Sequence, residues 1–248
     1  MSRPDVDWNA LAQEAARILA GPPAEARAWL TPLAERGIAQ AQVRLGQLLL
    51  DEAAGPPDPA GALAWFLKAA GQDDPLAFNM VGRCYENGWG APENIVVAAQ
   101  WYRQAAELGS DWGMYNHATR LMLGDAVGID RAGALTWFRK AAELGHAKSI
   151  NIVGGFYEDG WEVEQDFAQA RDHYRRAAEA GDFRGQFNFG RVLASEGAVN
   201  AALEQFAKAA VAATPAFIDK MVAFLSAAPI VAYRELADRL RRGKGPRP

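Results

Sequence analysis

Tryptophan recurs along this chain at a fixed interval of 36 residues. The residues of this series are Trp29, Trp65, Trp101 and Trp137. A second position of the same register carries Gly46, Gly82, Ala118, Gly154 and Gly190. Self-similarity at a period of 20–50 residues indicates a solenoid, because one unit cannot bury its apolar face alone and stacking with its neighbours buries it. We therefore expect a stack of like units.

Each unit is predicted to be a hairpin of two helices. In the clearest one, Ala77, Val81 and Tyr85 lie at i, i+4 and i+8, which places them on one stripe of a helix. The glycines of 88–90 then end that helix. Asn94 follows, and its side chain can cap the next helix by accepting hydrogen bonds from free backbone N–H groups. The same capping position in other units holds Asp58, Asp130 and Asp166.

The repeat register predicts an all-α chain with five central helix pairs. The expected pairs are 39–52 with 59–71, 75–87 with 95–107, 111–123 with 131–143, 147–159 with 167–179, and 183–195 with 199–212. Near residues 196–202 the register slips by four, which shortens the loop of the fifth pair. We expect residues 1–36 and 213–242 to form capping helix pairs and the basic tail 243–248 to be disordered.

The aromatic residues are expected to divide between core and surface. Those predicted to be largely buried are Trp65, Trp101, Trp137, Tyr85 and Tyr157, whereas Trp112 and Tyr115 are predicted to be substantially exposed. Trp89 and Trp161 occupy one loop position in two units. Each of these two either folds back over its own hairpin or serves as an exposed anchor for a partner. Of the two interpretations, the covering role is favoured.

These motifs resemble those of the Sel-1-like repeat family, a relative of the tetratricopeptide repeat. The pattern is carried by Ala77, Gly82, Tyr85, Gly88, Gly90, Asn94, Ala98, Trp101, Tyr102, Ala105, Ala106 and Gly109, and part of it recurs in Ala134, Trp137, Phe138, Lys140, Ala141, Ala142 and Gly145. The resemblance covers about residues 37–212. It implies an α/α right-handed superhelical solenoid of 36-residue helix-hairpin repeats. It also implies an adaptor or scaffold role and no shared catalytic residues.

Composition narrows the class of protein. The net charge of −4 and the pI near 5.5 argue against a dedicated nucleic-acid binder, which normally carries a basic face. Cys84 is the only cysteine, which favours a reducing compartment. Neither the start of the chain nor any later run is apolar enough for a signal peptide or a membrane span, so we expect a cytoplasmic protein with no membrane partner.

Candidate catalytic residues are few. His117 and His173 occupy packing columns of the repeat, and His146 lies at a junction between repeats, where we expect it to be solvated. Cys84 is interpreted as a small hydrophobic residue. The sequence contains no metal-ligand spacing, phosphate-binding loop or nucleophile elbow. We therefore expect no cofactor, no metal and no catalysis.

The resemblance places the first helix of each pair on the concave face of the array. Side chains predicted there are the candidate partner-binding residues Asn79, Arg83, Trp112, Tyr115, Lys148, Asn151, Arg184, Phe187 and Arg191. Lys148 and Arg184 share one repeat column and are expected to reach a common carboxylate or phosphate. These columns vary in chemistry where the packing columns do not, which is typical of a ligand face. An ordinary solvated helix face is the competing interpretation.

The leading hypothesis is a non-enzymatic adaptor that binds a peptide or protein segment in this groove. The alternative is an enzyme, or an enzyme accessory, acting on cell-wall or small-molecule substrates. A third hypothesis is nucleic-acid regulation through the basic tail. That tail carries Arg239, Arg241, Arg242, Lys244 and Arg247.

Overall fold

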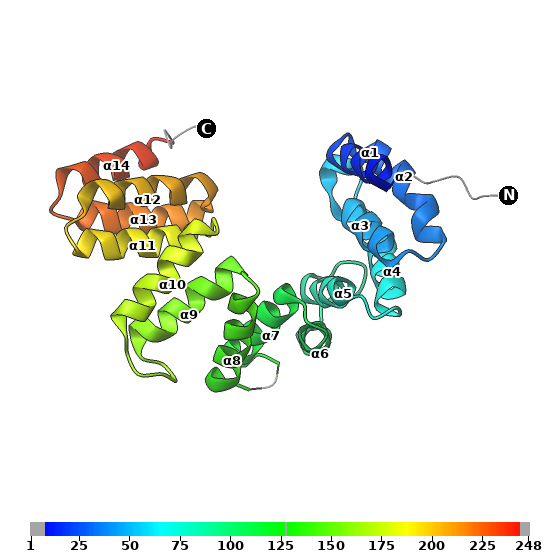
Figure 1. The fold of residues 1–248 in the computed structure, drawn as a ribbon, viewed down its shortest axis with the longest axis horizontal. Helices are drawn as coiled ribbons and strands as arrows, with labels where there is room; N and C mark the ends of the chain where they lie inside the picture. Colours follow the sequence, from blue (N-terminus) through cyan, green and yellow to red (C-terminus); the bar gives the residue numbers. More distant parts are fainter. Residues whose placement is uncertain (1–7, 127, 244–248) are drawn as a thin grey trace. The chain divides into compact units, whose positions relative to one another are not determined.

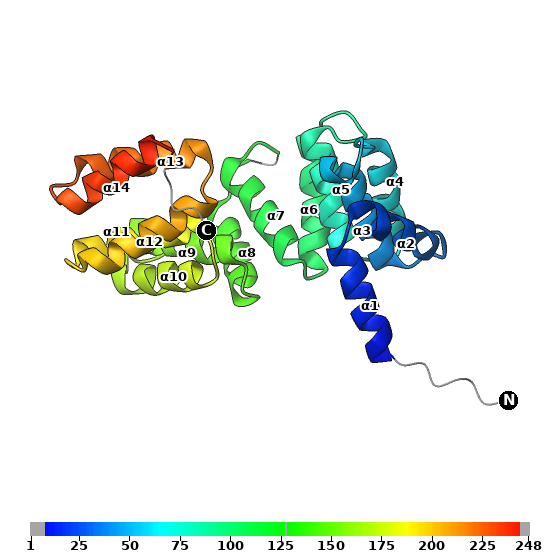
Figure 2. The same cartoon turned by 90° about the horizontal axis from the view of Figure 1, so that it is seen from above.

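A computed structural model describes residues 8–126 and 128–243 of the chain, and all regular structure in those residues is helical. The helices are α1 (Trp8–Ala20), α2 (Pro23–Glu35), α3 (Ala39–Leu50), the 3₁₀ helix η1 (Glu52–Ala54), α4 (Pro59–Ala70), α5 (Pro75–Asn87), α6 (Ile95–Glu107), α7 (Asp111–Leu123), α8 (Arg131–Glu143), α9 (Ala147–Asp159), α10 (Phe167–Glu179), α11 (Phe183–Ser195), α12 (Val199–Ala212), α13 (Pro215–Ala227) and α14 (Val231–Arg241). Figures 1 and 2 show consecutive helices running back and forth as hairpins.

The predicted all-α solenoid of helix hairpins is confirmed. The ten central helices agree with the expected ranges to within two residues. The largest difference is at α3, which ends at Leu50 because Asp51 accepts a hydrogen bond from Ala53 N and starts η1. The division into capping pairs and five repeats stays a prediction, and residues 244–248 of the predicted tail lie outside the described residues.

The chain divides into two compact units, residues 1–128 and 129–248. The first unit contains α1–α7, and its main core cluster is formed by α3, α4 and α5. The second contains α8–α14, and its main core cluster is formed by α11–α14, which lie side by side in Figure 1. Each unit thus has a hydrophobic core of its own.

A glycine on each of α3, α5, α9 and α11 lets an aromatic ring of the following helix approach closely. A Cβ atom added at Gly82 would lie 2.6 Å from the Tyr102 ring, and one at Gly190 would lie 2.6 Å from the Phe206 ring. Any larger residue would therefore push the two helices of the hairpin apart. The buried rings of this position are Phe66, Tyr102, Phe138, Tyr174 and Phe206.

The tryptophan series packs against the core of the repeat but is not fully buried. Its members Trp65, Trp101 and Trp137 are half-buried, as are Tyr85 and Tyr157. Adjacent residues on a helix point about 100° apart, so the fully buried place goes to the residue that follows each tryptophan. The tryptophans instead lie beside cations: Lys68 Nζ is 3.9 Å from the centre of the Trp65 ring, and Lys140 Nζ is 4.2 Å from that of Trp137.

Caps and loops agree with the sequence pattern. The side chains of Asn94 and Asp130 accept hydrogen bonds from Val97 N and Gly133 N, at 3.1 and 2.8 Å. Gly88 ends α5 in the left-handed conformation that glycine adopts without strain. The connections Gly88–Asn94 and Gly160–Asp166 are long, whereas the connection between α11 and α12 is reduced to Glu196–Ala198.

Candidate functional site

All nine candidate binding residues lie on first helices, as expected, but they divide between the two units. Asn79 and Arg83 are on α5, and Trp112 and Tyr115 are on α7, in the first unit. In the second unit the candidates on α9 are Lys148 and Asn151, and those on α11 are Arg184, Phe187 and Arg191. We describe the site in each unit separately.

Asn79 and Asn151 are buried and join neighbouring first helices. The Oδ1 atom of Asn79 accepts a hydrogen bond of 2.8 Å from Asn116 Nδ2, which links α5 to α7. In the second unit Asn151 Oδ1 accepts one of 2.9 Å from Asn188 Nδ2, which links α9 to α11. These two candidates therefore position the first helices, and they are not exposed contact residues.

In the first unit the accessible candidates are a cation and an aromatic pair. Arg83 is exposed, and its guanidinium carbon lies 5.1 Å from the centre of the Trp89 ring. Trp112 is 42% exposed, and its ring meets that of Tyr115 edge to face at 6.0 Å between centroids. Trp112 is thus more exposed than Trp101, as predicted, although Tyr115 is only half-exposed.

In the second unit an exposed arginine lies over a row of phenylalanine rings. The guanidinium carbon of Arg184 is 4.5 Å from the centre of the Phe183 ring and 5.7 Å from that of Phe217. Phe187 contacts Phe217 and Phe224, each at 5.4 Å between centroids. We name Arg184, Phe187, Phe217 and Phe224 the arginine–phenylalanine surface. It extends over α11 and α13.

The expected basic patch is smaller than the sequence suggested. Arg191 is not available, because its guanidinium pairs with Glu158 Oε1 at 2.8 Å and donates to Asn188 Oδ1 at 3.1 Å. Burial raises the pKa of the Asp182 carboxyl, and the positive charges of Arg184 and Lys148 oppose that rise. Asp182 belongs to the chain itself, since it caps α11 by accepting a hydrogen bond from Gly185 N.

A tyrosine–glutamate–arginine network occurs once in each unit and was not foreseen. In the second unit, Tyr174 OH donates a hydrogen bond of 2.5 Å to Glu158 Oε2, and Glu158 Oε1 accepts one from the Arg191 guanidinium. In the first unit, Tyr102 OH donates to Glu86, whose other carboxylate oxygen is 3.4 Å from Arg120. Burial and the nearby carboxylate raise the pKa of both tyrosines, so both remain phenols. The recurring 16-residue spacing from glutamate to tyrosine was the available signal.

The candidate catalytic residues are placed as packing and capping residues. Cys84 is fully buried, and this burial raises the pKa of its thiol to about 12, so little thiolate is present near neutral pH. His117 is half-buried, and burial lowers its pKa. The ring of His173 lies tilted against that of Tyr157 at 5.4 Å.

His146 corrects an expectation, because it is buried and not solvated. Its Nδ1 accepts a hydrogen bond of 3.3 Å from Ser149 N and lies 2.9 Å from the Ser149 hydroxyl. It therefore caps the start of α9, at the position where Asp182 caps α11. Among residues 8–126 and 128–243, no cluster of His, Cys, Asp and Glu could hold a metal ion.

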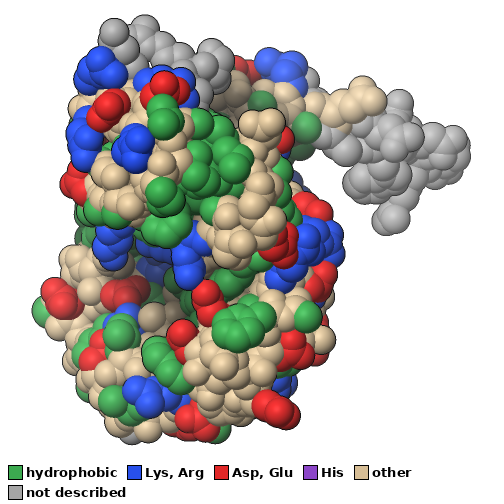
Figure 3. Space-filling view, turned by 90° about the vertical axis from the view of Figure 1, so that its left-hand side faces the viewer, with side chains coloured by type: hydrophobic (Ala, Val, Ile, Leu, Met, Phe, Trp, Pro, Cys, Tyr) green, Lys and Arg blue, Asp and Glu red, His purple; other side chains and the backbone are tan. Residues whose placement is uncertain are grey.

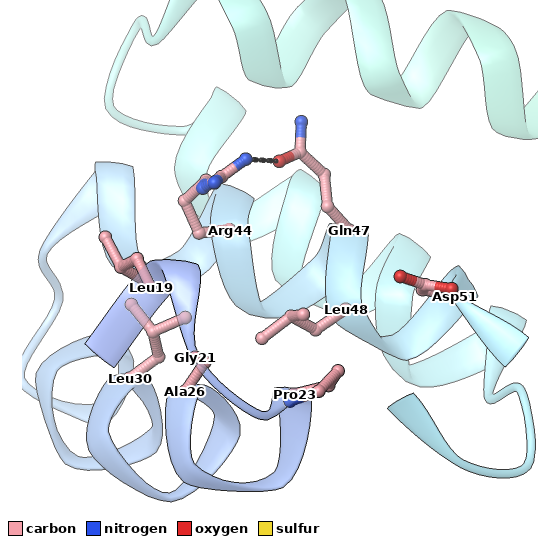
Figure 4. A pocket seen from close by; sticks show the side chains of 9 residues that line it. All are labelled: Leu19, Gly21, Pro23, Ala26, Leu30, Arg44, Gln47, Leu48 and Asp51. Atoms are coloured by element: carbon pink, nitrogen blue, oxygen red, sulfur yellow. Dashed lines mark hydrogen bonds between the residues drawn. The ribbon is translucent and has the colours of Figure 1, made fainter. Parts of the chain in front are cut away.

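Each unit also contains a pocket. In the first unit a small one of about 280 Å³ lies between α2 and α3, where Arg44 donates a hydrogen bond of 2.9 Å to Gln47 (Figure 4). A larger hollow of about 640 Å³ in the second unit is walled by Phe167, Arg171, Arg191, Val192, Phe224 and Tyr233, among others. Only Arg191 of the nine candidates lines either pocket.

The stacked hairpins and their bonded first helices define an α-helical repeat protein. The model of the Sel1 repeat family matches residues 39–74, 75–110, 113–146 and 147–182. These matches cover more than half of the chain, which therefore belongs to the Sel1 repeat family. The hairpin of α11 and α12 packs in the same manner although the family model does not extend to it. Sel1 repeat proteins are generally scaffolds for protein interaction, and the fold is typically non-catalytic.

Solved structures of bacterial proteins share this fold. A Sel1 repeat protein from Oxalobacter formigenes is 23% identical, with a TM-score of 0.77, and the match covers 94% of this chain and 99% of that one. A protective antigen of uropathogenic Escherichia coli is 27% identical, with a TM-score of 0.64, over 89% of this chain and 49% of that one. An immunity protein from Pseudomonas aeruginosa is 18% identical, with a TM-score of 0.58, over 83% and 81%. Comparison with curated proteins gave no match.

Proposed function

We propose that this chain is a non-enzymatic adaptor that binds a segment of a partner protein on its first helices, chiefly through the arginine–phenylalanine surface. The observation that supports this most is the exposure of Arg184 directly over an aromatic row. Family membership supports the general role, because Sel1 repeat proteins are scaffolds. Of the nine candidate residues, Asn79, Asn151 and Arg191 are then set aside as partner contacts, because they are buried or paired within the chain.

The structure supports a rigid surface in the second unit. The bond between Asn151 and Asn188 fixes α9 against α11, and the ring contacts of Phe187 fix α11 against α13. A partner segment would therefore bind without ordering these helices, which lowers the entropic cost of association.

The chemistry of this surface favours an acidic segment that also carries an apolar or aromatic side chain. The Arg184 guanidinium lies over the Phe183 ring and is exposed, so its N–H groups can donate to a carboxylate of the partner. Phe224 is 38% exposed and offers apolar area next to it. Lys148 lies near Asp182, at the same end of α11, and adds positive potential.

The first unit supplies a second contact surface of similar composition. There Trp112 and Tyr115 provide aromatic area on α7, and Arg83 provides a cation on α5. The bond between Asn79 and Asn116 holds α5 and α7 together in the same way. Tryptophan and arginine are the residues most often found to dominate binding energy at protein interfaces.

An affinity capture from native lysate tests the proposal. The full chain should enrich a specific protein, and Arg184→Glu should abolish its capture by reversing the charge of the surface. The matched control is Lys208→Glu, an exposed position on the second helix α12. If the Arg184→Glu variant and the Trp112→Ala variant both still capture the partner, these two surfaces do not bind it.

Salt dependence gives a second readout on the same partner. If a carboxylate of the partner binds Arg184, its affinity should fall as the salt concentration rises. Binding that does not change with salt would remove the acidic segment from the proposal.

The described helices contain no segment long and apolar enough to cross a membrane. The cytoplasmic location remains a prediction.

A further inference from the structure

We propose that the 640 Å³ hollow of the second unit binds the tryptophan side chain of a partner polypeptide. Phe224 lines this hollow and also belongs to the arginine–phenylalanine surface, but the proposal does not depend on binding at that surface. Figure 3 looks onto this side of the molecule and shows hydrophobic side chains gathered around a hollow that contains Lys and Arg side chains. The hollow lies within the size range of about 300–1,000 Å³ that is usual for small-ligand pockets.

The first argument is that the equivalent place in an earlier repeat is filled by a tryptophan loop. The long loop Gly160–Asp166 brings Trp161 back over the first residue of α8, and the Arg131 guanidinium carbon lies 5.3 Å from its ring. In the first unit the loop Gly88–Asn94 returns in the same way, because a Cβ at Gly90 would lie 2.3 Å from the Pro59 carbonyl oxygen at the start of α4.

The fifth hairpin lacks such a loop. Its connection is only Glu196–Ala198, which is too short to return over the first residue of α10, Phe167. Phe167 is 65% exposed and lines the hollow. The repeat therefore provides a place for a loop and its indole, and this chain leaves that place open.

The second argument is an unsatisfied polar atom in the wall. Tyr233 is 2% exposed and lines the hollow, yet its hydroxyl has no hydrogen-bond partner among the described residues. A buried hydroxyl without a partner is costly, and a ligand that supplies the bond removes that cost. The indole N–H is such a donor, attached to a large apolar body.

The charges of the wall favour a neutral occupant. Arg171 pairs with Glu196 at 2.8 Å and Arg191 pairs with Glu158 at 2.8 Å, so the charges bordering the hollow are balanced. Between them lie apolar side chains, including Val192, Phe224 and Ile230. A charged side chain would be desolvated here without a counter-ion, whereas an indole would not.

The test is a titration of the isotope-labelled full chain with N-acetyl-tryptophanamide, followed by NMR. We expect a Kd on the order of 0.1–1 mM, with shifts at Tyr233, Val192 and Phe167. N-acetyl-leucinamide should bind at least about tenfold more weakly, because its side chain has neither the aromatic ring nor the indole N–H donor. Equal binding of the two probes, or no binding, would overturn the proposal.

Two variants locate the site. Tyr233→Phe removes only the unpartnered hydroxyl, so the fold should be retained and the Kd should rise about fivefold. Ala194→Phe fills the hollow from α11 and should abolish binding, whereas Ala201→Phe, at an exposed position of α12, should not. Unchanged binding in Tyr233→Phe would overturn the assignment. Arg184→Glu should leave the Kd unchanged, which separates this site from the proposed adaptor surface.

The source of the tryptophan is settled by sedimentation of the chain alone. A monomer at high concentration supports a different polypeptide as the partner. Self-association that Trp161→Ala abolishes would overturn that part of the proposal, because the occupant would then be a second copy of this chain.

Discussion

The α9–α10 and α11–α12 hairpins of the second unit have the same core but different connections. In each, a glycine of the first helix faces a buried ring of the second: Gly154 faces Tyr174, and Gly190 faces Phe206. Their loops differ, because Gly160–Asp166 carries Trp161 whereas Glu196–Ala198 is a tight turn. Helix packing in these two hairpins therefore does not depend on the long loop, which the α11–α12 hairpin lacks.

The ring environments also differ. Tyr174 donates a hydrogen bond to Glu158, which in turn holds Arg191 of the following repeat. Phe206 has no such polar group and is packed among Phe187, Phe224 and Tyr233. The comparison teaches that one repeat position is filled either by a polar link between repeats or by an aromatic cluster.

Loss of the aromatic cluster should give the largest effect. Phe206→Ala removes a fully buried ring, and we expect the free energy of unfolding to fall by about 3–5 kcal/mol. Val211→Ala, which truncates a side chain that is 60% exposed on the same helix, should change it by less than about 0.5 kcal/mol. Urea denaturation of the full chain measures both. Similar values for the two variants would contradict the assignment of the core.

Loss of the polar link should have an intermediate effect. Tyr174→Phe leaves the Glu158–Arg191 pair with one hydrogen bond fewer, and we expect a destabilisation of about 1–3 kcal/mol. The matched substitution in the first unit, Tyr102→Phe, removes the corresponding bond to Glu86 and should have a similar cost. A neutral result in both would mean that the network contributes nothing to stability.

The same network predicts a pH dependence on the alkaline side. Burial and Glu158 raise the pKa of Tyr174 in the folded chain, whereas an unfolded tyrosine titrates near pH ~10. Above that pH the unfolded chain loses the proton more readily than the folded chain. The free energy of unfolding should therefore fall as the pH rises through ~10, and Tyr174→Phe should reduce this slope. An unchanged slope in the variant would show that the tyrosine is not the source.

The covering tryptophan should have the smallest effect on stability. Trp161 is 45% exposed, although its ring contacts Phe156 edge to face at 6.3 Å. We expect Trp161→Ala to lower the free energy of unfolding by no more than about 1–2 kcal/mol, well below the value for Phe206→Ala. Thermal denaturation of the two variants side by side measures the difference. Equal shifts would mean that the loop is part of the core.

The helices were predictable because the same residues recur at the same positions of a 36-residue period. Ten helices follow from one 36-residue period, since every cap, glycine and alanine column repeats the same information. The short turn at Glu196–Ala198 was also visible as a slip in that register. The hollow could not be predicted in this way, because it depends on whether the loop of one hairpin covers the start of the second helix of the hairpin before it.

The candidate site was less predictable for a related reason. Periodicity assigns a residue to a helix face, but it does not show whether a polar side chain is paired within the array. Asn79 and Asn151 find partners one repeat onward, and Arg191 finds Glu158 one repeat back. His146 likewise looked solvated in sequence and is a buried cap. The pairings of Asn79, Asn151 and Arg191 need coordinates, since each joins residues of different repeats, whereas the cap of His146 is local to the start of α9.

The most direct test of the adaptor proposal is hydrogen exchange of the full chain with and without its captured partner. Binding to the arginine–phenylalanine surface should slow exchange in α11 and α13, and the Arg184→Glu variant should lose this protection. The second helices α10 and α12 should exchange as in the free chain. Protection confined to α10 and α12, or none in α11 and α13, would contradict binding through the first helices.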